Sequence, residues 1–188
     1  MSLNDYKVAV VTGASSGIGA AVARDLGRRG LKVHAIARRE ERLANLEGCM
    51  THVLDVRDTK ALTGLLESIK VDILVNNAGL LHNGFFTELD INAQERMIAV
   101  NVLALTSLTH LYANDMSARK NGHILNVASL AGWMPIPNQN VYAATKSYVL
   151  SFTQALADEL NAAGNGVVVS ALCPGYTATK MMDNPDQG

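Results

Sequence analysis

The octapeptide TGASSGIG at residues 12–19 is the stretch that decides the fold. It follows a short apolar run at residues 7–11, expected to be a buried strand, and opens a segment of helical spacing at residues 17–29 that Gly30 stops. Glycines at a strand-to-helix turn let a pyrophosphate approach the unpaired N–H groups of the helix N-terminus. The loop predicts a dinucleotide-binding unit, and a tight turn without a ligand is the alternative.

The rest of the chain alternates strand-like and helix-like segments in the same way. Apolar runs predict strands at residues 32–37, 52–56, 73–76, 123–128 and 166–173, and apolar spacing predicts helices at 62–69, 93–117 and 141–161. This alternation implies right-handed crossovers and a parallel sheet covered on both faces. We therefore expect one α/β domain over residues 1–188, a three-layer, doubly wound, Rossmann-like sheet.

Composition excludes several other classes of protein. The 188 residues are 48% hydrophobic and 18% charged with a net charge of -1, which argues against a nucleic-acid-binding face. Cys49 and Cys173 are far apart and the histidines lack ligand spacing, so no metal site is expected. The N-terminus has no signal-peptide pattern, and polar residues interrupt the apolar stretch 97–113. The chain is expected to be cytoplasmic and to have no membrane span.

The end of the second expected strand indicates the type of nucleotide. NAD-binding proteins tend to carry an acid there, whereas this chain has Ala37 followed by Arg38 and Arg39. An arginine can hold a ribose 2′-phosphate that a carboxylate would repel, so NADP(H) is the preferred cofactor and NAD(H) the second option. A solvated basic turn is the alternative reading. Asp55 is expected to reach the adenine edge, or else to cap a helix.

Tyr142 and Lys146 lie four residues apart, so a helix over 141–161 presents both on one face. A phenol with its usual pKa of about 10 is a poor acid–base group near neutrality, and an adjacent ammonium favours the phenolate. Ser129 ends the strand expected at 123–128, where its hydroxyl can hold a substrate oxygen beside Tyr142. The three residues predict a proton donor for hydride chemistry on a carbonyl or alcohol, although an isolated pair at this spacing is usually a surface pair.

With these blocks in order along the chain, the sequence resembles the short-chain dehydrogenase/reductase superfamily. The resemblance rests on residues 12–19, Asp55, the segment 76–79 (NNAG), Asn101, Ser129, Tyr142, Lys146 and Pro174-Gly175. It implies catalytic roles for four residues: Tyr142 as general acid–base, Lys146 as its activator and ribose ligand, Ser129 on the carbonyl, and Asn101 holding a water. It implies cofactor contacts from Gly13, Ser15, Ser16, Gly17, Ile18, Gly19, Arg38, Asp55, Asn77, Ala78, Gly79, Tyr142, Lys146, Pro174, Gly175 and Thr177.

The sequence departs from the family pattern at two places. Ser16 occupies a position that is often basic, which would weaken the grip on a 2′-phosphate. Family members commonly continue past the equivalent of Gly188 with a substrate-covering segment and one more strand, so this chain is expected to lack the lid and last strand. A non-catalytic NADP-binding or sensing module therefore remains the alternative to an oxidoreductase.

Apolar side chains predict the substrate and the assembly. Residues expected to border the pocket are mostly apolar, which favours a hydrophobic or aromatic small-molecule carbonyl: Leu80, Leu81, Phe85, Trp133, Met134 and Ile136, with Tyr176 nearby. Residues 97–116 and the helix from Val141 carry apolar side chains around much of their circumference. Two such helices need a second partner, so we expect a homodimer or, through further contacts, a homotetramer.

Overall fold

The computed structural model describes residues 5–175. Their six strands form one parallel sheet in the order β3-β2-β1-β4-β5-β6. The strands are β1 (Val8–Thr12), β2 (Lys32–Ala37), β3 (Cys49–Val53), β4 (Ile73–Asn76), β5 (Gly122–Val127) and β6 (Val167–Leu172). The chain moves outward from β1 to β3 and then restarts at β4 on the other side of β1. This reversal of strand order confirms the doubly wound α/β fold.

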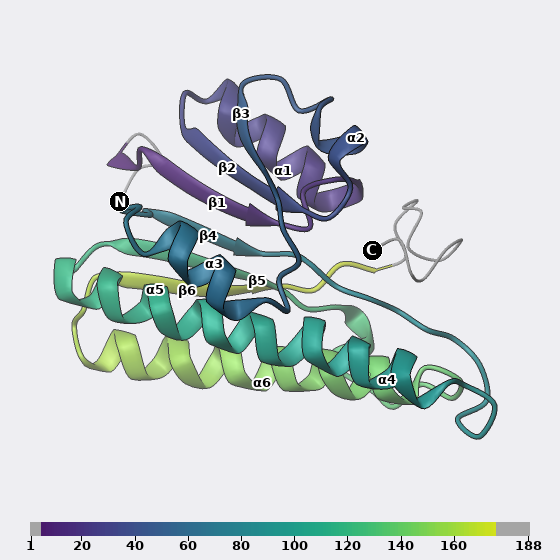
Figure 1. Cartoon of the computed structure of the whole chain (residues 1–188). Helices are drawn as coiled ribbons and strands as arrows, with labels where there is room; N and C mark the ends of the chain where they lie inside the picture. Colours follow the sequence, from purple (N-terminus) through teal and green to yellow (C-terminus); the bar gives the residue numbers. More distant parts are fainter. Residues whose placement is uncertain (1–4, 176–188) are drawn as a thin grey trace.

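Helices cover both faces of the sheet and make the outer two of three layers (Figure 1). They are α1 (Gly17–Arg28), α2 (Glu40–Leu43), α3 (Thr59–Leu66), α4 (Ile91–Ile98), α5 (Leu105–Arg119) and α6 (Asn140–Ala162), with a π-helix η2 (Ala99–Ala104) and a 3-10 turn η3 (Leu130–Gly132). Side chains of α1 pack with one face of β1 and β2 in one apolar core. Those of α3, α5 and α6 pack with the opposite face in a second core.

Two elements differ from the sequence-based expectation. The third strand was placed at residues 52–56, but β3 is Cys49–Val53, so Asp55 follows the strand instead of ending it. Because β3 is an edge strand, its outward side chains are exposed, Val53 at 53%, and apolar runs mark such strands poorly. The helix expected at 93–117 runs continuously from α4 to α5 but contains η2. The apolar period does not reveal the extra residue of a π-turn.

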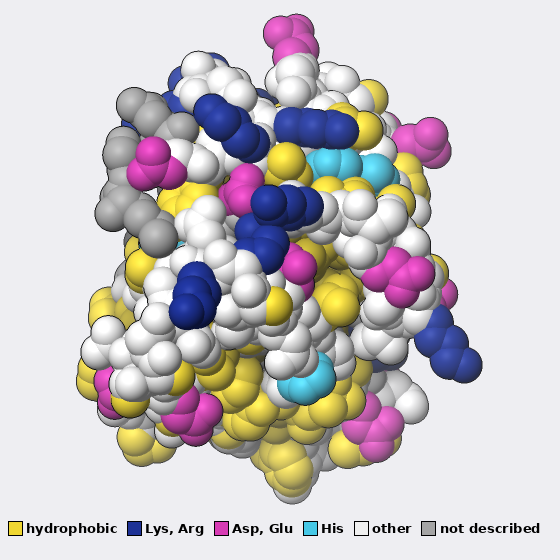
Figure 2. Space-filling view, turned by 90° about the vertical axis from the view of Figure 1, so that its left-hand side faces the viewer, with side chains coloured by type: hydrophobic (Ala, Val, Ile, Leu, Met, Phe, Trp, Pro, Cys, Tyr) yellow, Lys and Arg dark blue, Asp and Glu magenta, His cyan; other side chains and the backbone are white. Residues whose placement is uncertain are grey.

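The amino ends of the strands are held together by a buried carboxylate. Asp72 Oδ2 accepts hydrogen bonds from the backbone N–H groups of Lys7 (2.8 Å) and Val8 (3.1 Å) at the start of β1. Arg119 donates to Asp72 Oδ1 (3.4 Å), to the Val71 carbonyl (2.6 Å) and to Asp115 Oδ2 (2.8 Å). On the surface around this end, Lys and Arg side chains lie beside Asp and Glu side chains (Figure 2).

The helix Ile91–Arg119 is long and apolar enough to meet a length and mean-hydropathy criterion for a membrane span, but 44% of its most apolar stretch is buried inside the protein. It packs on β4 and β5, as the core helix of a globular protein does. This helix is therefore weak support for a membrane span.

Candidate active site

The glycine loop joins β1 to α1 at the carboxyl end of the sheet. Gly13 (φ 65°) and Gly17 (φ 55°) have backbone angles that other residues rarely adopt. At Gly19 the limit is space, since a Cβ there would lie 2.4 Å from the Gly13 carbonyl oxygen and from Asn77 Nδ2. The sequence-predicted loop residues thus form a sharp turn, with Ser15 buried and Ile18 partly exposed at the start of α1.

The NNAG segment is fastened to this loop from the neighbouring strand. Asn77 Nδ2 donates to the carbonyls of Thr12 (3.0 Å) and Gly13 (3.2 Å). Thr12 Oγ1 accepts the N–H groups of Asn77 and Ala78, each at 3.0 Å. The ends of β1 and β4, on the two sides of the strand-order reversal, are therefore one rigid unit. Sequence reasoning identified the segment but not Thr12 as the group that holds it.

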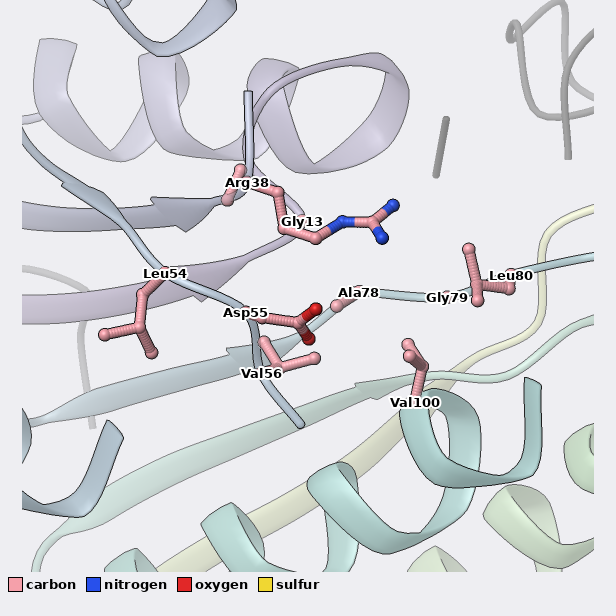
Figure 3. A pocket seen from close by; sticks show the side chains of 10 residues that line it. Gly13, Arg38, Leu54, Asp55, Val56, Ala78, Gly79, Leu80 and Val100 are labelled. Atoms are coloured by element: carbon pink, nitrogen blue, oxygen red, sulfur yellow. The ribbon is translucent and has the colours of Figure 1, made fainter. Parts of the chain in front are cut away.

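A pocket opens beside this unit, where doubly wound sheets bind their ligands. Ten residues line it: Gly13, Ala37, Arg38, Leu54, Asp55, Val56, Ala78, Gly79, Leu80 and Val100. The Arg38 and Asp55 side chains project into it from the ends of β2 and β3 (Figure 3). The sequence-predicted nucleotide residues Gly13, Arg38, Asp55, Ala78 and Gly79 are thus brought together. The lining combines small residues, Gly13, Ala37, Ala78 and Gly79, with the polar side chains of Arg38 and Asp55.

Asp55 is not aimed at the pocket alone, because Arg57 holds its carboxylate. Arg57 Nη2 lies 2.6 Å from Asp55 Oδ2, and the Arg57 backbone N–H donates to Oδ1 at 2.9 Å. Burial alone would raise the pKa of Asp55, but the hydrogen bonds from Arg57, with the charge of Arg38, outweigh it and lower that pKa. Asp55 is therefore an ionised acceptor at the pocket rim.

Arg39, which follows Arg38 in the turn expected to hold a 2′-phosphate, contacts the glycine loop directly. Its Nη2 donates to Ser15 Oγ (2.7 Å) and Ser16 Oγ (3.0 Å). Its Nη1 is buried and has no hydrogen-bond partner among residues 5–175. Burial and the nearby charges of Arg42 and Arg38 lower the pKa of this guanidinium, so cationic groups crowd the turn. An unpaired buried N–H of Arg39 near the charges of Arg38 and Arg42 is suited to an anion.

The expected proton-transfer residues converge at the ends of β5 and α6. Ser129 follows β5 and caps η3, its Oγ accepting the Ala131 N–H at 3.1 Å, and it is hydrogen-bonded to Tyr142. Lys146 Nζ lies 5.7 Å from the centre of the Tyr142 ring and donates to the Val127 carbonyl at 2.8 Å. Gly79 lies beside the ammonium, since a Cβ there would be 3.6 Å from Lys146 Nζ. The proton-transfer residues and the cofactor loop therefore share one site.

Burial controls the acid–base character of this group. Desolvation raises the pKa of Tyr142, and the hydrogen bond with Ser129 partly opposes the rise. Desolvation lowers the pKa of Lys146 to about 8, opposed by the charge of Cys173. Lys146 is expected from the sequence to lower the pKa of the phenol, whereas within the chain the hydrogen bond with Ser129 is the contact that lowers it.

Asn101 lies in η2 and its side chain joins three elements. Its Oδ1 accepts the Leu80 N–H (2.8 Å), and its Nδ2 donates to the Leu80 carbonyl (2.9 Å) and to Thr145 Oγ1 (3.0 Å). Both amide hydrogens are thus used, so this side chain holds protein groups instead of being reserved for the water that the resemblance implied. Any water would have to be held through other atoms, such as the backbone of the π-turn.

The remaining expected residues lie after β6 or outside the described part. The Pro174 carbonyl accepts the Leu130 N–H at 3.0 Å, which ties this segment to the β5 end, and Gly175 lies against the Leu130 side chain. Thr177 lies outside residues 5–175, as does Tyr176. Of the residues expected at the substrate pocket, Leu80 and Leu81 are core residues, whereas Phe85, Trp133 and Met134 are exposed at 64%, 60% and 58%.

A doubly wound sheet with a glycine loop at its reversal point, joined to a buried Ser–Tyr–Lys group, defines a nicotinamide-dependent oxidoreductase. The comparison with known families agrees, because the short chain dehydrogenase model matches residues 7–188. The chain belongs to the short-chain dehydrogenase/reductase family. It is therefore an oxidoreductase that acts on CH–OH groups with NAD(P).

Relatives of known sequence and structure are similar over most of the chain. An uncharacterized oxidoreductase of Staphylococcus saprophyticus is 38% identical over 97% of this chain and 83% of its own length. A very-long-chain 3-oxoacyl-CoA reductase of Anas platyrhynchos is 34% identical over 92% of this chain and 60% of its own length.

Solved structures give the same result for fold and cofactor. A Burkholderia phymatum family member in complex with NAD superposes with a TM-score of 0.91 at 32% identity, covering 97% of this chain and 70% of that one. A Sphingobium yanoikuyae dehydrogenase in complex with NADPH gives 0.86 at 33% identity, covering 93% and 73%. Some structural neighbours are in complex with NADP(H) and others with NAD, in agreement with the expectation of NADP(H) as the preferred cofactor and NAD(H) as the second option.

Proposed function

We propose that this protein interconverts a ketone or aldehyde and its alcohol with NADP(H), using Tyr142 as the general acid–base. The observation that carries the proposal is the convergence of Ser129, Tyr142 and Lys146 beside Gly79. Ser129 follows β5 whereas Tyr142 and Lys146 lie on α6, and all three are at least nine-tenths buried. A binding or sensing module has no need for a proton donor, its hydrogen-bond partner and a buried ammonium in one place.

The roles follow from the hydrogen-bonding capacity of each group. Ser129 and Tyr142 can both donate to a carbonyl oxygen, which fixes the substrate and polarises it. Burial keeps the phenol protonated near neutrality, as a proton donor for reduction must be. The bound nicotinamide supplies the hydride. Lys146 has two N–H groups beyond the one given to Val127, and they can hold the ribose hydroxyls.

The preference for NADP(H) is assigned to Arg38 and Arg39 together. Arg38 lines the nucleotide pocket, and Arg39 bridges to Ser15 and Ser16 with one buried N–H left over. A 2′-phosphate would supply acceptors to both guanidiniums. Ser16 carries no positive charge, and the guanidinium of Arg39, which donates to Ser16 Oγ, supplies one at that place.

An apolar substrate is favoured by the surface beside the proton donor. Phe85 and Phe86 follow β4, while Leu130, Trp133 and Met134 follow β5, and all five are more than half exposed. The two loops are joined by the hydrogen bond from Gly84 N–H to the Asn138 carbonyl at 2.9 Å. We propose that these two loops bind a hydrophobic or aromatic group attached to the substrate carbonyl.

A homodimer through α4, α5 and α6 is the proposed assembly. Leu103 is 60% exposed and Ile98 41%, both on the outer side of the long helix. On α6, Tyr148 stacks on Phe152 and its hydroxyl meets Thr106 Oγ1 at 3.0 Å, which joins the two helices into one apolar face. Leu103→Glu should therefore halve the mass measured by light scattering at micromolar concentration, and a wild-type monomer would refute the dimer. We also propose that the protein works in the cytoplasm.

Tyr142→Phe tests the reaction, with Tyr148→Phe as the matched control on the same helix. NADPH oxidation would be followed against a panel of aliphatic and aromatic ketones and aldehydes. Tyr142→Phe should lower kcat by about 100-fold or more, since it removes only the proton donor, and should leave NADPH affinity within about threefold. Tyr148→Phe should retain the wild-type rate.

Two outcomes would contradict the proposal. Near wild-type turnover by Tyr142→Phe would remove the phenol from the reaction. Tight NADPH binding by the wild type without turnover of any carbonyl would support the binding module instead.

A further inference from the structure

Thr145 lies between the two residues of α6 on which the reaction depends. Its side chain is buried, 4% exposed, so its hydroxyl cannot be hydrated by bulk solvent. The hydroxyl donates to the Tyr142 carbonyl at 2.7 Å and accepts Asn101 Nδ2 at 3.0 Å. It is therefore fixed by one bond within its own helix and one bond to η2.

The Asn101 amide extends this contact to the cofactor side of the site. Its remaining hydrogen bonds go to the backbone N–H and carbonyl of Leu80, which lines the nucleotide pocket. Leu80, Asn101, Thr145 and Tyr142 thus form one chain of short hydrogen bonds. It links the loop after β4, the π-turn and the catalytic turn of α6.

From this arrangement we infer that Thr145 is a positioning residue, whose hydroxyl sets where the Tyr142 turn lies relative to Ser129 and the cofactor loop. The inference rests on the proposed function of Tyr142. A threonine hydroxyl bonded to a carbonyl of the preceding turn also biases the local bend of a helix. Loss of the hydroxyl would leave the second Asn101 N–H without an acceptor and free the turn to shift.

Thr153, two turns further along α6, is a natural control. It is 1% exposed, donates to the Val149 carbonyl at 2.6 Å and accepts Asn126 Nδ2 at 3.0 Å. Its hydrogen bonds match those of Thr145 in kind, but its amide partner belongs to β5, and Asn76 Nδ2 donates to that same amide at 2.9 Å. This second network holds α6 to the ends of β5 and β4, where Asn76 begins the NNAG segment, and it includes neither Asn101 nor the Tyr142 turn.

The experiment compares Thr145→Val, Thr145→Ser and Thr153→Val in the full chain. The ionisation of Tyr142 would be titrated by its ultraviolet difference spectrum, with Tyr142→Phe as the reference. The kcat and KM values would be measured with NADPH and the carbonyl that the wild type reduces fastest. Both valine variants should lower the melting temperature, because each leaves a buried amide N–H unpaired.

Only Thr145→Val should change the chemistry. We expect its kcat to fall about tenfold with KM little changed, and the pKa of Tyr142 to rise by at least about half a unit as the Ser129 contact loosens. Thr145→Ser should restore both quantities, and Thr153→Val should leave both at the wild-type value.

The inference is overturned if Thr145→Val keeps the wild-type kcat and Tyr142 titration, or if Thr153→Val shifts them equally. If the wild type reduces no carbonyl, the proposed function fails, but the titration still decides whether Thr145 positions the phenol. If Thr145→Val does not fold, Thr145→Ala takes its place, and a titration equal to that of Thr153→Ala would refute the inference.

Discussion

Charged side chains buried at the two ends of the parallel sheet differ in how they are satisfied. At the amino end, Asp72 and Arg119 satisfy each other and the backbone of β1, so the contacts close within the chain. At the carboxyl end, Arg39 Nη1 has no partner among the described residues, and Lys146 is buried with a pKa near 8. Unsatisfied buried groups cost stability, so the first end contributes to folding and the second is reserved for ligands.

The largest expected effect is at the amino end. Asp72→Ala removes the acceptor of two backbone N–H groups and leaves Arg119, a largely buried cation, without one carboxylate. We expect a loss of about 3 kcal/mol in the free energy of unfolding, measured by urea denaturation. NADPH affinity of the folded protein should not change.

Asp115→Ala is the matched control for that experiment. Asp115 is the other carboxylate of Arg119, but its side chain is 46% exposed, so water replaces it readily. The loss should stay below about 1 kcal/mol. Equal losses in the free energy of unfolding for the two variants would show that Asp72 contributes no more than an exposed ion-pair partner and that its contacts with β1 do not stabilise the amino end.

A smaller effect, confined to one ligand, is expected at the nucleotide rim. Arg38→Asp should weaken NADPH binding by about 10- to 100-fold, because it replaces a charge-assisted hydrogen bond to the 2′-phosphate with repulsion. NADH binding should change little, since NADH lacks that phosphate, and stability should be unaffected at this exposed position. Fluorescence titration with both cofactors measures the ratio.

Arg39→Ala complements this variant. It should also weaken NADPH more than NADH, but with a modest loss for both, because Arg39 also holds Ser15 and Ser16 of the glycine loop. Equal weakening of NADPH and NADH by both variants would contradict the assignment of the 2′-phosphate to this turn.

Local and periodic features were predictable from the sequence, and the closed amino end was not. The glycine loop, the order of strands and helices, and the meeting of Ser129 with Tyr142 and Lys146 follow from motifs and spacing. The Asp72 clamp depends on how β4 lies beside β1, where Ala9 pairs with Ile73, and nothing local to Asp72 indicates it.

The same limit applies at the carboxyl end. Whether Arg38 or Arg39 meets the glycine loop depends on how the turn after β2 lies against Ser15, which is 24 residues away in sequence. The hydrogen bonds of the Asn101 side-chain amide to Leu80 and Thr145 depend on the π-turn, which the spacing of apolar residues does not reveal. Both features depend on which way a side chain points after long-range packing, and such information is absent from a local pattern.

A change in stability of the opposite sign, smaller than that of Asp72→Ala, is expected at the reactive centre. Lys146 is 5% exposed and burial lowers its pKa from 10.5 to about 8, so its charge opposes folding at neutral pH. Lys146→Met keeps the length of the side chain and removes the charge. We expect it to raise the free energy of unfolding by about 1–2 kcal/mol at pH 7 while abolishing turnover.

The pH dependence gives this last expectation its sharpest test. Between pH 8 and 10.5, folded Lys146 has lost its proton while the unfolded side chain still binds one. Wild-type stability therefore rises with pH in this window relative to Lys146→Met, and the advantage of the variant shrinks as the pH approaches 10. Denaturation at pH 7, 8.5 and 9.5 would measure it, with Lys120→Met, an exposed lysine at the C-terminal end of α5, as the control. If the difference in free energy of unfolding between the wild type and Lys146→Met stayed constant over this pH range, or if the variant were less stable, the buried ammonium would be a structural group. Lys146 would then stabilise the fold as Asp72 does, and the contrast between the two ends of the sheet would not hold.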